Sequence, residues 1–183
     1  MEIIKGNFNN LEEINFAKAN EFNEKYLSDI LMLERECFPE SWLYSDASEY
    51  YMNALKNKNN INIFLKKNNQ TVGYILAIPH NDMVEDLLKD DGFLEKKDNF
   101  YYIETIQIIT QSRGSGGAEK LLKSVCEEAV ERGVNNFSIH ARLLNGFADK
   151  LKKIFEGKVS IVRNIESWKY GGDEPYEYIE WSY

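Results

Sequence analysis

Apolar residues repeat with two different periods along this chain, and the change of period marks a strand followed by a helix. Residues 101–110 (YYIETIQIIT) are rich in Tyr, Ile and Thr, a composition that favours a sheet strand. Within 118–130 the apolar residues recur every three or four positions, as they do on one face of a helix. Gly114, Gly116 and Gly117 lie between the two stretches. The sequence therefore predicts a strand, a glycine-rich corner and a helix in direct succession.

The same two periods predict the remaining elements, and their order gives the fold class. The expected helices cover 26–37, 47–56 and 144–155, and the expected strands cover 14–22, 61–65, 71–78, 137–141, 159–162 and 176–181. Asp46 is expected to cap the second helix, and Gly171-Gly172 to join the last two strands. A strand–helix–strand–helix order requires the two strands to be parallel. We therefore expect an α/β protein with a single domain over residues 1–183.

The corner between strand and helix is built like a phosphate site. Glycines remove side chains where the chain turns, so backbone N–H groups can approach a ligand while the helix dipole favours an anion. A kinase-type P-loop needs Gly-Lys-Ser/Thr at the helix start, whereas this chain has Gly116-Gly117-Ala118-Glu119. A dinucleotide fingerprint needs a third glycine, where Glu119 stands here. A glycine-rich turn that binds nothing is the alternative.

The stretch 113–122 resembles the Arg/Gln-x-x-Gly-x-Gly/Ala signature of the GNAT superfamily, the acyl-CoA-dependent N-acyltransferases, with Arg113, Gly116 and Ala118 at the signature positions. Residues 106–108 also match that family's apolar-x-apolar strand end. The resemblance implies a GNAT-like mixed, partly splayed β-sheet flanked by helices. It also implies an enzyme that transfers an acetyl group from acetyl-CoA to a primary amine, a small cationic amine or a protein amino group, in a ternary complex. A non-catalytic acyl-CoA-binding or regulatory protein and a structural interaction domain are the alternatives.

The resemblance assigns part of this region to acetyl-CoA. In the family the pantetheine adds to the sheet like an extra strand, and the glycine corner holds the pyrophosphate. The residues implied for the cofactor are Ile106, Gln107, Ile108, Arg113, Gly114, Ser115, Gly116, Gly117, Ala118 and Asn145. Asn145 also suits the N-cap of the helix that follows, and the two roles are compatible.

Two residues are candidates for the base that takes the proton of the amine. Glu104 lies mid-strand, where burial would raise its pKa towards a useful value, and many relatives carry an acidic residue on this strand. His140 lies five residues before Asn145, where some relatives place a catalytic glutamate, and an unperturbed histidine pKa of about 6.5 suits the task. The plain alternatives are a partner for a buried polar group at Glu104 and a hydrogen-bonded strand residue at His140, and Glu104 is preferred as the base. Lys152 stands where many relatives have a tyrosine as general acid, so the sequence does not identify the acid.

Two regions are expected near the acceptor by the same resemblance. Phe38 and Trp42 lie in a Phe-Pro-x-x-Trp loop that borders the acceptor site in many relatives, although either ring would also suit the core. A polar insertion at 80–99 follows Pro79, is longer than an ordinary connection and contains a short helical pattern (MVEDLLKD). This insertion is either a specificity element or a solvated acidic loop. The acids expected to hold a cationic acceptor are Glu85, Asp86, Asp90 and Asp91.

The net charge and the cysteine content limit the kinds of binding partner and of site that we expect. Thirty acidic and 22 basic residues give a net charge of −8 and a pI near 4.9, a balance that repels nucleic acid and anionic membranes and attracts cations. Cys37 and Cys126 fall in apolar helix stripes, which suits buried side chains better than a metal site or a disulfide. No apolar run approaches the roughly 20 residues that span a bilayer, and the first residues lack the core of a signal peptide. We expect a cytoplasmic protein that holds no metal, binds acyl-CoA and an amine, and is compatible with a homodimer.

Overall fold

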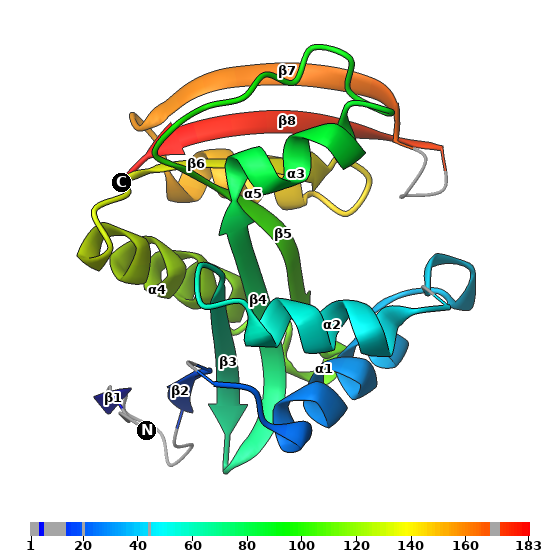
Figure 1. Ribbon diagram of the computed structural model, residues 1–183, viewed down its shortest axis with the longest axis vertical. Coiled ribbons are helices and arrows are strands. Elements are labelled where there is room, and N and C mark those ends of the chain that lie inside the picture. The colour runs from blue at the N-terminus through cyan, green and yellow to red at the C-terminus, as the bar shows by residue number, and fades with distance from the viewer. Residues whose placement is uncertain (1–3, 6–13, 20, 44, 169–172) are drawn as a thin grey trace. The chain divides into compact units, whose positions relative to one another are not determined.

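The structure is a computed structural model that describes residues 4–5, 14–19, 21–43, 45–168 and 173–183 (Figure 1). Its internal contacts divide the chain into two compact units. The first unit comprises 1–77 and 105–125, and the second unit comprises 78–104 and 126–183. Strands β4 (Gln70–Pro79) and β5 (Phe100–Ile108) and helix α4 (Gly117–Glu131) contribute residues to both units.

The first unit is built on strands in the order β1-β2-β3-β4-β5. Neighbours from β1 (Ile4–Lys5) through β2 (Ile14–Lys18) and β3 (Ile61–Lys67) to β4 are antiparallel. The polar turn between β3 and β4 has Asn68 and Asn69 at positive φ, the conformation of a two-residue hairpin turn.

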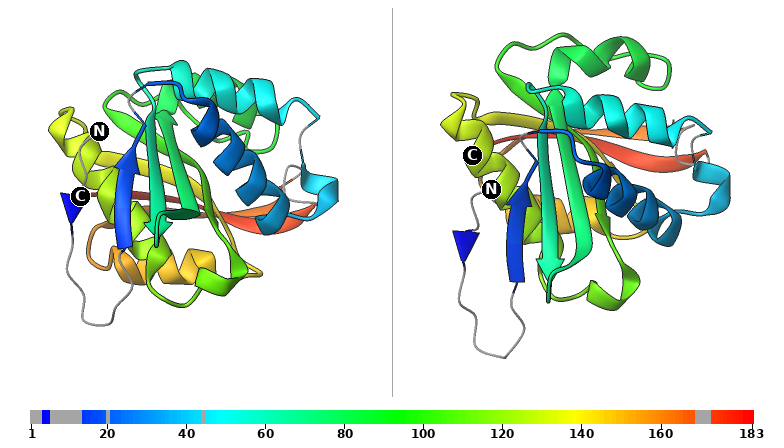
Figure 2. Two further views of the ribbon diagram at one scale, coloured as in Figure 1. Left: turned by 90° about the horizontal axis from the view of Figure 1, so that it is seen from below. Right: turned by 60° about the horizontal axis from the view of Figure 1, so that its bottom comes forward.

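Two helices of the first unit, α1 (Glu24–Cys37) and α2 (Ala47–Lys56), lie side by side over one face of β3 and β4 (Figure 2). Tyr26 of α1 stacks on Phe64 of β3 with ring centroids 4.5 Å apart. The next residue of β3, Leu65, points to the opposite face, where it lies beside the start of α4. Helices therefore cover both faces of this part of the sheet.

The two helices differ in whether a side chain caps their first turn. The Asn23 side chain accepts a hydrogen bond from the backbone N–H of Lys25 and so caps α1. Asp46 stands at the N-cap position of α2, but its side chain makes no capping hydrogen bond, so that prediction was wrong. Its φ and ψ of −107° and 15° depart from the extended conformation that capping side chains usually need.

The second unit has the strand order β5-β6-β8-β7. Strand β6 (Asn136–Arg142) is antiparallel to β8 (Glu174–Ser182), which is antiparallel to β7 (Val159–Trp168). Strands β5 and β6 are parallel, as the element order predicts, and their pairing runs from Phe100↔Asn136 to Tyr102↔Ser138. Beyond these pairs β5 continues to Ile108 and β6 to Arg142, so the strands part. The expectation of an α/β fold with a mixed, partly splayed sheet is confirmed.

Two helices complete the second unit, α3 (His80–Leu87) and α5 (Phe147–Ile154). Trp181 of β8 stacks between Phe137 of β6 and Phe155 after α5, with centroid distances of 5.4 and 4.8 Å. This aromatic stack is fully buried and forms part of the core of the unit. In the described part of the chain no helix is long and apolar enough to cross a membrane.

Three boundaries differ from the predictions by more than two residues, and one predicted turn cannot be compared with the structure. The strand expected at 14–22 ends at Lys18, the helix expected from 144 begins at Phe147, and β7 extends to Trp168 instead of ending at 162. The helix starts late because Gly146, at a φ of +70°, forms its N-cap. The predicted turn at Gly171-Gly172 lies outside the described residues.

Candidate functional site

The glycine corner lies in the first unit, between the end of β5 and the start of α4. A short 3₁₀ turn (Thr110–Ser112) follows β5, and the chain then passes through Gly114 and Gly116 at φ values of +79° and +80°. These left-handed conformations are readily available to glycine alone. The Arg113 side chain turns back and donates from Nε to the Ile108 carbonyl at 2.9 Å, which ties the corner to the strand end.

The space around the corner fits a phosphate group. A Cβ added at Gly114 or Gly116 would meet no atom within 4 Å, so the backbone there is open to a ligand. A Cβ added at Gly117 would lie 3.0 Å from Leu65 and 3.1 Å from Ile108, so glycine lets α4 begin close to the sheet without moving these two side chains. The first N–H groups of a helix have no acceptor within the helix and carry its positive dipole end. Open backbone and leading N–H groups together form the kind of cradle that binds diphosphates.

The strand segment before the corner is the expected cofactor strand, Ile106 to Ile108. The Gln107 side chain is buried and donates from Nε2 to the Tyr51 hydroxyl at 3.3 Å. Tyr51 in turn donates to the Glu34 carboxylate of α1 at 3.2 Å, and burial raises the pKa of Glu34. This chain of polar side chains joins α1 and α2 to the strand, and sequence reasoning missed it because each residue looks like an isolated polar position.

The aromatic loop lies directly after α1. The rings of Phe38 and Trp42 are tilted against each other with centroids 6.2 Å apart, and both are partly buried. Cys37, one residue earlier, is partly exposed, contrary to the expectation of two buried cysteines, whereas Cys126 is fully buried. Burial raises the pKa of the Cys37 thiol, and the nearby Arg113 side chain opposes this rise. The start of the loop thus lies near Arg113 of the corner.

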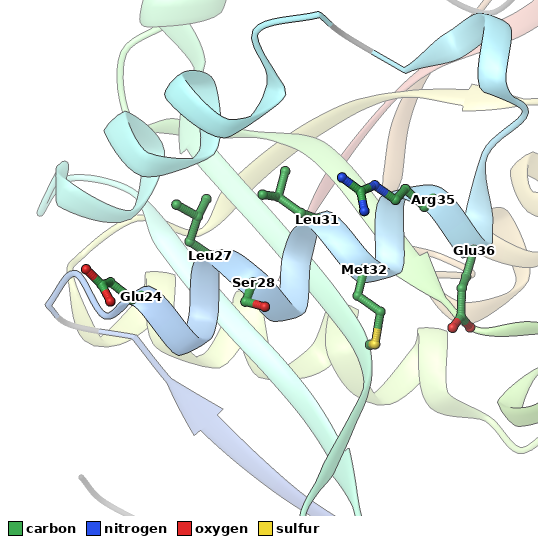
Figure 3. A pocket seen from close by; sticks show the side chains of 7 residues that line it. All are labelled: Glu24, Leu27, Ser28, Leu31, Met32, Arg35 and Glu36. Atoms are coloured by element: carbon green, nitrogen blue, oxygen red, sulfur yellow. The ribbon is translucent and has the colours of Figure 1, made fainter.

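A shallow groove runs along α1 (Figure 3). Its lining comes from successive turns of this one helix: Glu24, Leu27, Ser28, Leu31, Met32, Arg35 and Glu36. A groove lined by a single helix does not gather converging polar groups from several elements, as ligand sites usually do. We therefore do not place the site there.

The two candidate bases belong to the second unit, and one of them, His140, is hydrogen-bonded to Tyr102. Both ring nitrogens of His140 are occupied: Nδ1 lies 3.0 Å from the Tyr102 hydroxyl and Nε2 lies 3.0 Å from Asp91 Oδ2. The ring stacks on Trp168 at 4.1 Å, and its side chain is 1% exposed. Burial lowers the pKa of His140, although the hydrogen bond that its ring donates to Asp91 opposes this. Any substrate amine would have to displace Tyr102 or Asp91 to reach a nitrogen of His140.

Glu104 is partly buried on β5, two residues after Tyr102. Alternate strand residues share a face, so the two side chains lie on the same side of the sheet. Burial raises the pKa of Tyr102 well above its ordinary value, and the Glu104 charge adds to this.

The insertion at 80–99 is folded onto the second unit. It begins with α3, which confirms the predicted helical turns. The ring of His80, the first residue of α3, is hydrogen-bonded to Ser138 of β6 at 2.8 Å and to the Glu95 carbonyl of the insertion at 2.9 Å. Asp91 is not a surface acid, because its side chain is fully buried and paired with Arg163 and His140. Burial alone would raise the pKa of Asp91, but these hydrogen bonds outweigh it and lower the pKa. The insertion is thus folded, and the pairing of the buried Asp91 with Arg163 and His140 holds it to β7 and β6.

Asn145 and Lys152 both have structural partners. Asn145 Oδ1 accepts a hydrogen bond from the Phe147 N–H at 3.0 Å, but Gly146 stands at the N-cap position of α5, so the expectation that Asn145 is the N-cap was wrong. Lys152 Nζ lies 2.7 Å from Glu177 and 3.0 Å from Asp149, and the hydrogen bond to Glu177 is the larger cause of its raised pKa.

Comparison with known proteins identifies the family. The chain matches the Acetyltransferase (GNAT) family over residues 27–152, and it belongs to this family. Acetyl-CoA is the cosubstrate of the family. No curated protein sequence matches the chain.

Solved structures share the fold at low sequence identity. An aminoglycoside 6'-N-acetyltransferase complexed with coenzyme A is 15% identical, with a TM-score of 0.66 over 91% of this chain and 96% of that one. The ribosomal-protein-S18-alanine N-acetyltransferase from Escherichia coli is 13% identical, with a TM-score of 0.63 over 94% of each chain. The PaiA N-acetyltransferase from Thermoplasma acidophilum, also with coenzyme A, is 11% identical, with a TM-score of 0.64 over 93% and 99%. At these identities the likeness concerns the fold alone.

Proposed function

We propose that this protein transfers an acetyl group from acetyl-CoA directly to a primary amine in a ternary complex. The observation that carries the proposal is the corner of the first unit, where Gly114 and Gly116 adopt left-handed conformations in open space ahead of α4. Membership of the family supports it, because acetyl-CoA is the family's cosubstrate. The acetyltransferases among the solved structures support the same reaction class.

The corner would hold the pyrophosphate and the strand the pantetheine. Backbone N–H groups of Arg113 to Ala118 would donate to the phosphate oxygens, and Arg113 keeps the corner in place through its bond to Ile108. The backbone of Ile106 to Ile108 would hydrogen-bond an extended ligand. Asn145 would contact the cofactor, and its side chain accepts a hydrogen bond from Phe147, the first residue of α5. When bound, acetyl-CoA supplies an activated thioester carbonyl.

Glu104 is the proposed base. Direct transfer requires a neutral amine and hence a group that takes its proton, but it requires no side-chain nucleophile. Between the two candidates the geometry favours Glu104, because both nitrogens of His140 are already hydrogen-bonded to other side chains. Phe38 and Trp42 would border the amine, since their loop follows Cys37, which lies near Arg113 of the corner.

The net charge of the protein suggests the chemical class of the amine that accepts the acetyl group. A net charge of −8 attracts cations, so we propose an acceptor with a second positive group, as in a polyamine or a basic peptide. An amine screen that follows thiol release from acetyl-CoA tests this class and the reaction together. Tight binding of acetyl-CoA without thiol release to any amine would favour the alternative, an acyl-CoA-binding regulatory protein.

The placement of the cofactor is tested by a pair of glycine variants. Gly116→Val should weaken acetyl-CoA binding by about tenfold or more in calorimetry, because the side chain blocks the phosphate approach and opposes the left-handed backbone. Gly133→Val is the matched control, since Gly133 has a φ of +83°, open surroundings and a place near the other end of α4. Equal affinities of the two variants would show that the corner does not hold acetyl-CoA.

A further inference from the structure

The outer face of α1 in the first unit is more apolar than a helix on the surface needs to be. Ile30 and Leu33 already bury one face of α1 in the core, and both are 0% exposed. The opposite face of such a helix is usually polar. On α1 it carries the shallow groove of Figure 3, in which Leu27 and Leu31 are partly buried and Met32 is 40% exposed. A second apolar stripe on a helix that is already packed is a feature of surfaces that another polypeptide covers.

Two opposite charges stand at the ends of this stripe. Glu24 lies in the first turn of α1 and Arg35 in the last turn, and both side chains are exposed. Glu24, Ser28, Leu31 and Arg35 follow one another at intervals of four, three and four residues, so they lie along one line on the helix. Since α1 has 14 residues and is about 21 Å long, the acid and the base lie near opposite ends of the groove.

This order of charges is complementary to itself when the direction of the helix is reversed. In a pair with two-fold symmetry, a residue that contacts a second residue of the other copy is contacted by that residue in return. Glu24 and Arg35 lie equally far from the midpoint between residues 29 and 30, and so do Ser28 and Leu31. Two antiparallel α1 helices related by a two-fold axis at this midpoint would bring each Glu24 opposite Arg35 of the other copy. Each Leu31 would lie opposite Ser28 of the other copy, where the small side chain leaves room for it.

We propose that the outer face of α1 is a homodimer surface, on which α1 of a second copy of this chain lies antiparallel. Charge complementarity selects this occupant. An acidic segment would meet Glu24 and a basic segment would meet Arg35, in each case with like charge, whereas the reversed copy of α1 meets only opposite charges along this line. At a net charge of −8 two copies repel each other in general, so their association depends on this local match. The surface goes beyond the proposed acetyl transfer and does not depend on it.

The oligomeric state of the unmodified protein is measured first. One pair of helices of this length makes a contact smaller than the standard interface of about 1,600 Å², so we expect a dimer that dissociates on dilution. Sedimentation velocity between about 1 and 100 µM should show the mass rising from that of one chain, 21.4 kDa, towards twice that value. A mass that stays at that of one chain over this range would overturn the proposal.

Reversing the two charges then tests the arrangement. In a dimer of Glu24→Arg the new arginine faces Arg35 at both ends of the contact, and in a dimer of Arg35→Glu the new glutamate faces Glu24. Each variant alone should dissociate at least about tenfold more readily than the parent, because two attractions become two repulsions. An equimolar mixture should return to within about threefold of the parent's dissociation constant, because one variant then offers only arginines and the other only glutamates. Recovery on mixing also shows that both variants are folded.

Glu49→Arg is the matched control, because Glu49 is an exposed acid in the first turn of α2, the neighbouring helix of the same unit. It changes the net charge as much as Glu24→Arg does and should leave the dissociation constant within about twofold of the parent's. An equal loss in both variants would assign the effect to net charge and overturn the proposal. A dimer that both charge reversals leave intact would do the same, since its surface would lie elsewhere. Variants that stay monomeric when mixed would rule out the antiparallel pairing.

Discussion

Lys152 shows how neighbours decide what a single residue does. The family resemblance places it where many relatives have a tyrosine that acts as general acid. Here the ammonium group is paired with Glu177 and Asp149, and these partners raise its pKa. A group that holds its proton this firmly is a poor proton donor at neutral pH. Its task is to join α5 to β8, the strand that carries Glu177.

Lys152→Met should therefore lower kcat by less than about threefold, since no proton transfer depends on the ammonium group. Glu104→Gln, measured beside it, should lose roughly 100-fold at neutral pH with acetyl-CoA affinity retained, because the base is gone. Both values come from steady-state thiol release. Comparable losses in the two variants would place Lys152 in the chemical step after all.

The packing of strand β4 likewise depends on the elements beside it. Its Gly73 lies so close to β5 that an added Cβ would be 3.0 Å from the Gln107 carbonyl oxygen, and 3.2 and 3.3 Å from Ile108 and Leu121. The nearest of these atoms belongs to the backbone and cannot rotate away. The glycine thus allows β4, β5 and α4 to pack closely behind the corner in the first unit.

Gly73→Ala should destabilise the protein by about 1–3 kcal/mol, the usual cost of overpacking a filled site. Gly92→Ala is the control, because a Cβ at Gly92 meets nothing within 4 Å and its φ is not positive. Urea denaturation of the two variants gives the comparison. If both midpoints equal that of the parent, the close approach at Gly73 does not contribute to stability.

Elements with one buried face were predictable from the sequence, and the others were not. The helix at 118–130 and the strand at 137–141 were found within one residue at each end, because their apolar positions follow the burial of a helix stripe or a strand. Most of β7 is exposed, so its sequence has no such alternation and more than half of the strand was missed. Asp91 was interpreted as a surface acid because its partners, His140 and Arg163, lie 49 and 72 residues away. The position of the glycine corner between strand and helix was predicted correctly, because a turn depends on residues that are consecutive in the sequence.

The stability of the protein as a whole should depend on pH through its two histidines. Burial lowers the pKa of both His80 and His140 below the ordinary 6.5. Between the lowered pKa and 6.5 the unfolded chain binds protons that the folded chain does not, so stability is lost as pH falls through this window. The pKa of Asp91 is also lowered, which extends the loss below its ordinary 3.8. Glu34, whose pKa is raised, acts in the opposite sense just above 4.5.

The free energy of unfolding in urea should therefore fall from about pH 6.5 downwards, with a slope of at most about 2.7 kcal/mol per pH unit for two protons. Replacing one histidine by glutamine should roughly halve the slope, whichever of the two is changed. A free energy that is constant between pH 5 and 7 would contradict the assignment of two buried neutral imidazoles.

The strand order of the second unit has a consequence for the growing chain on the ribosome. Strand β8 lies between β6 and β7, although it is made after both. At about 5–20 residues per second, the interval from the end of β6 at Arg142 to the end of β8 at Ser182 lasts roughly 2–8 s. During that time the edge of β6 that will receive β8 is unpaired, and an open edge can pair with another chain. The nascent protein is thus most exposed to faulty association in the last seconds before β8 is complete.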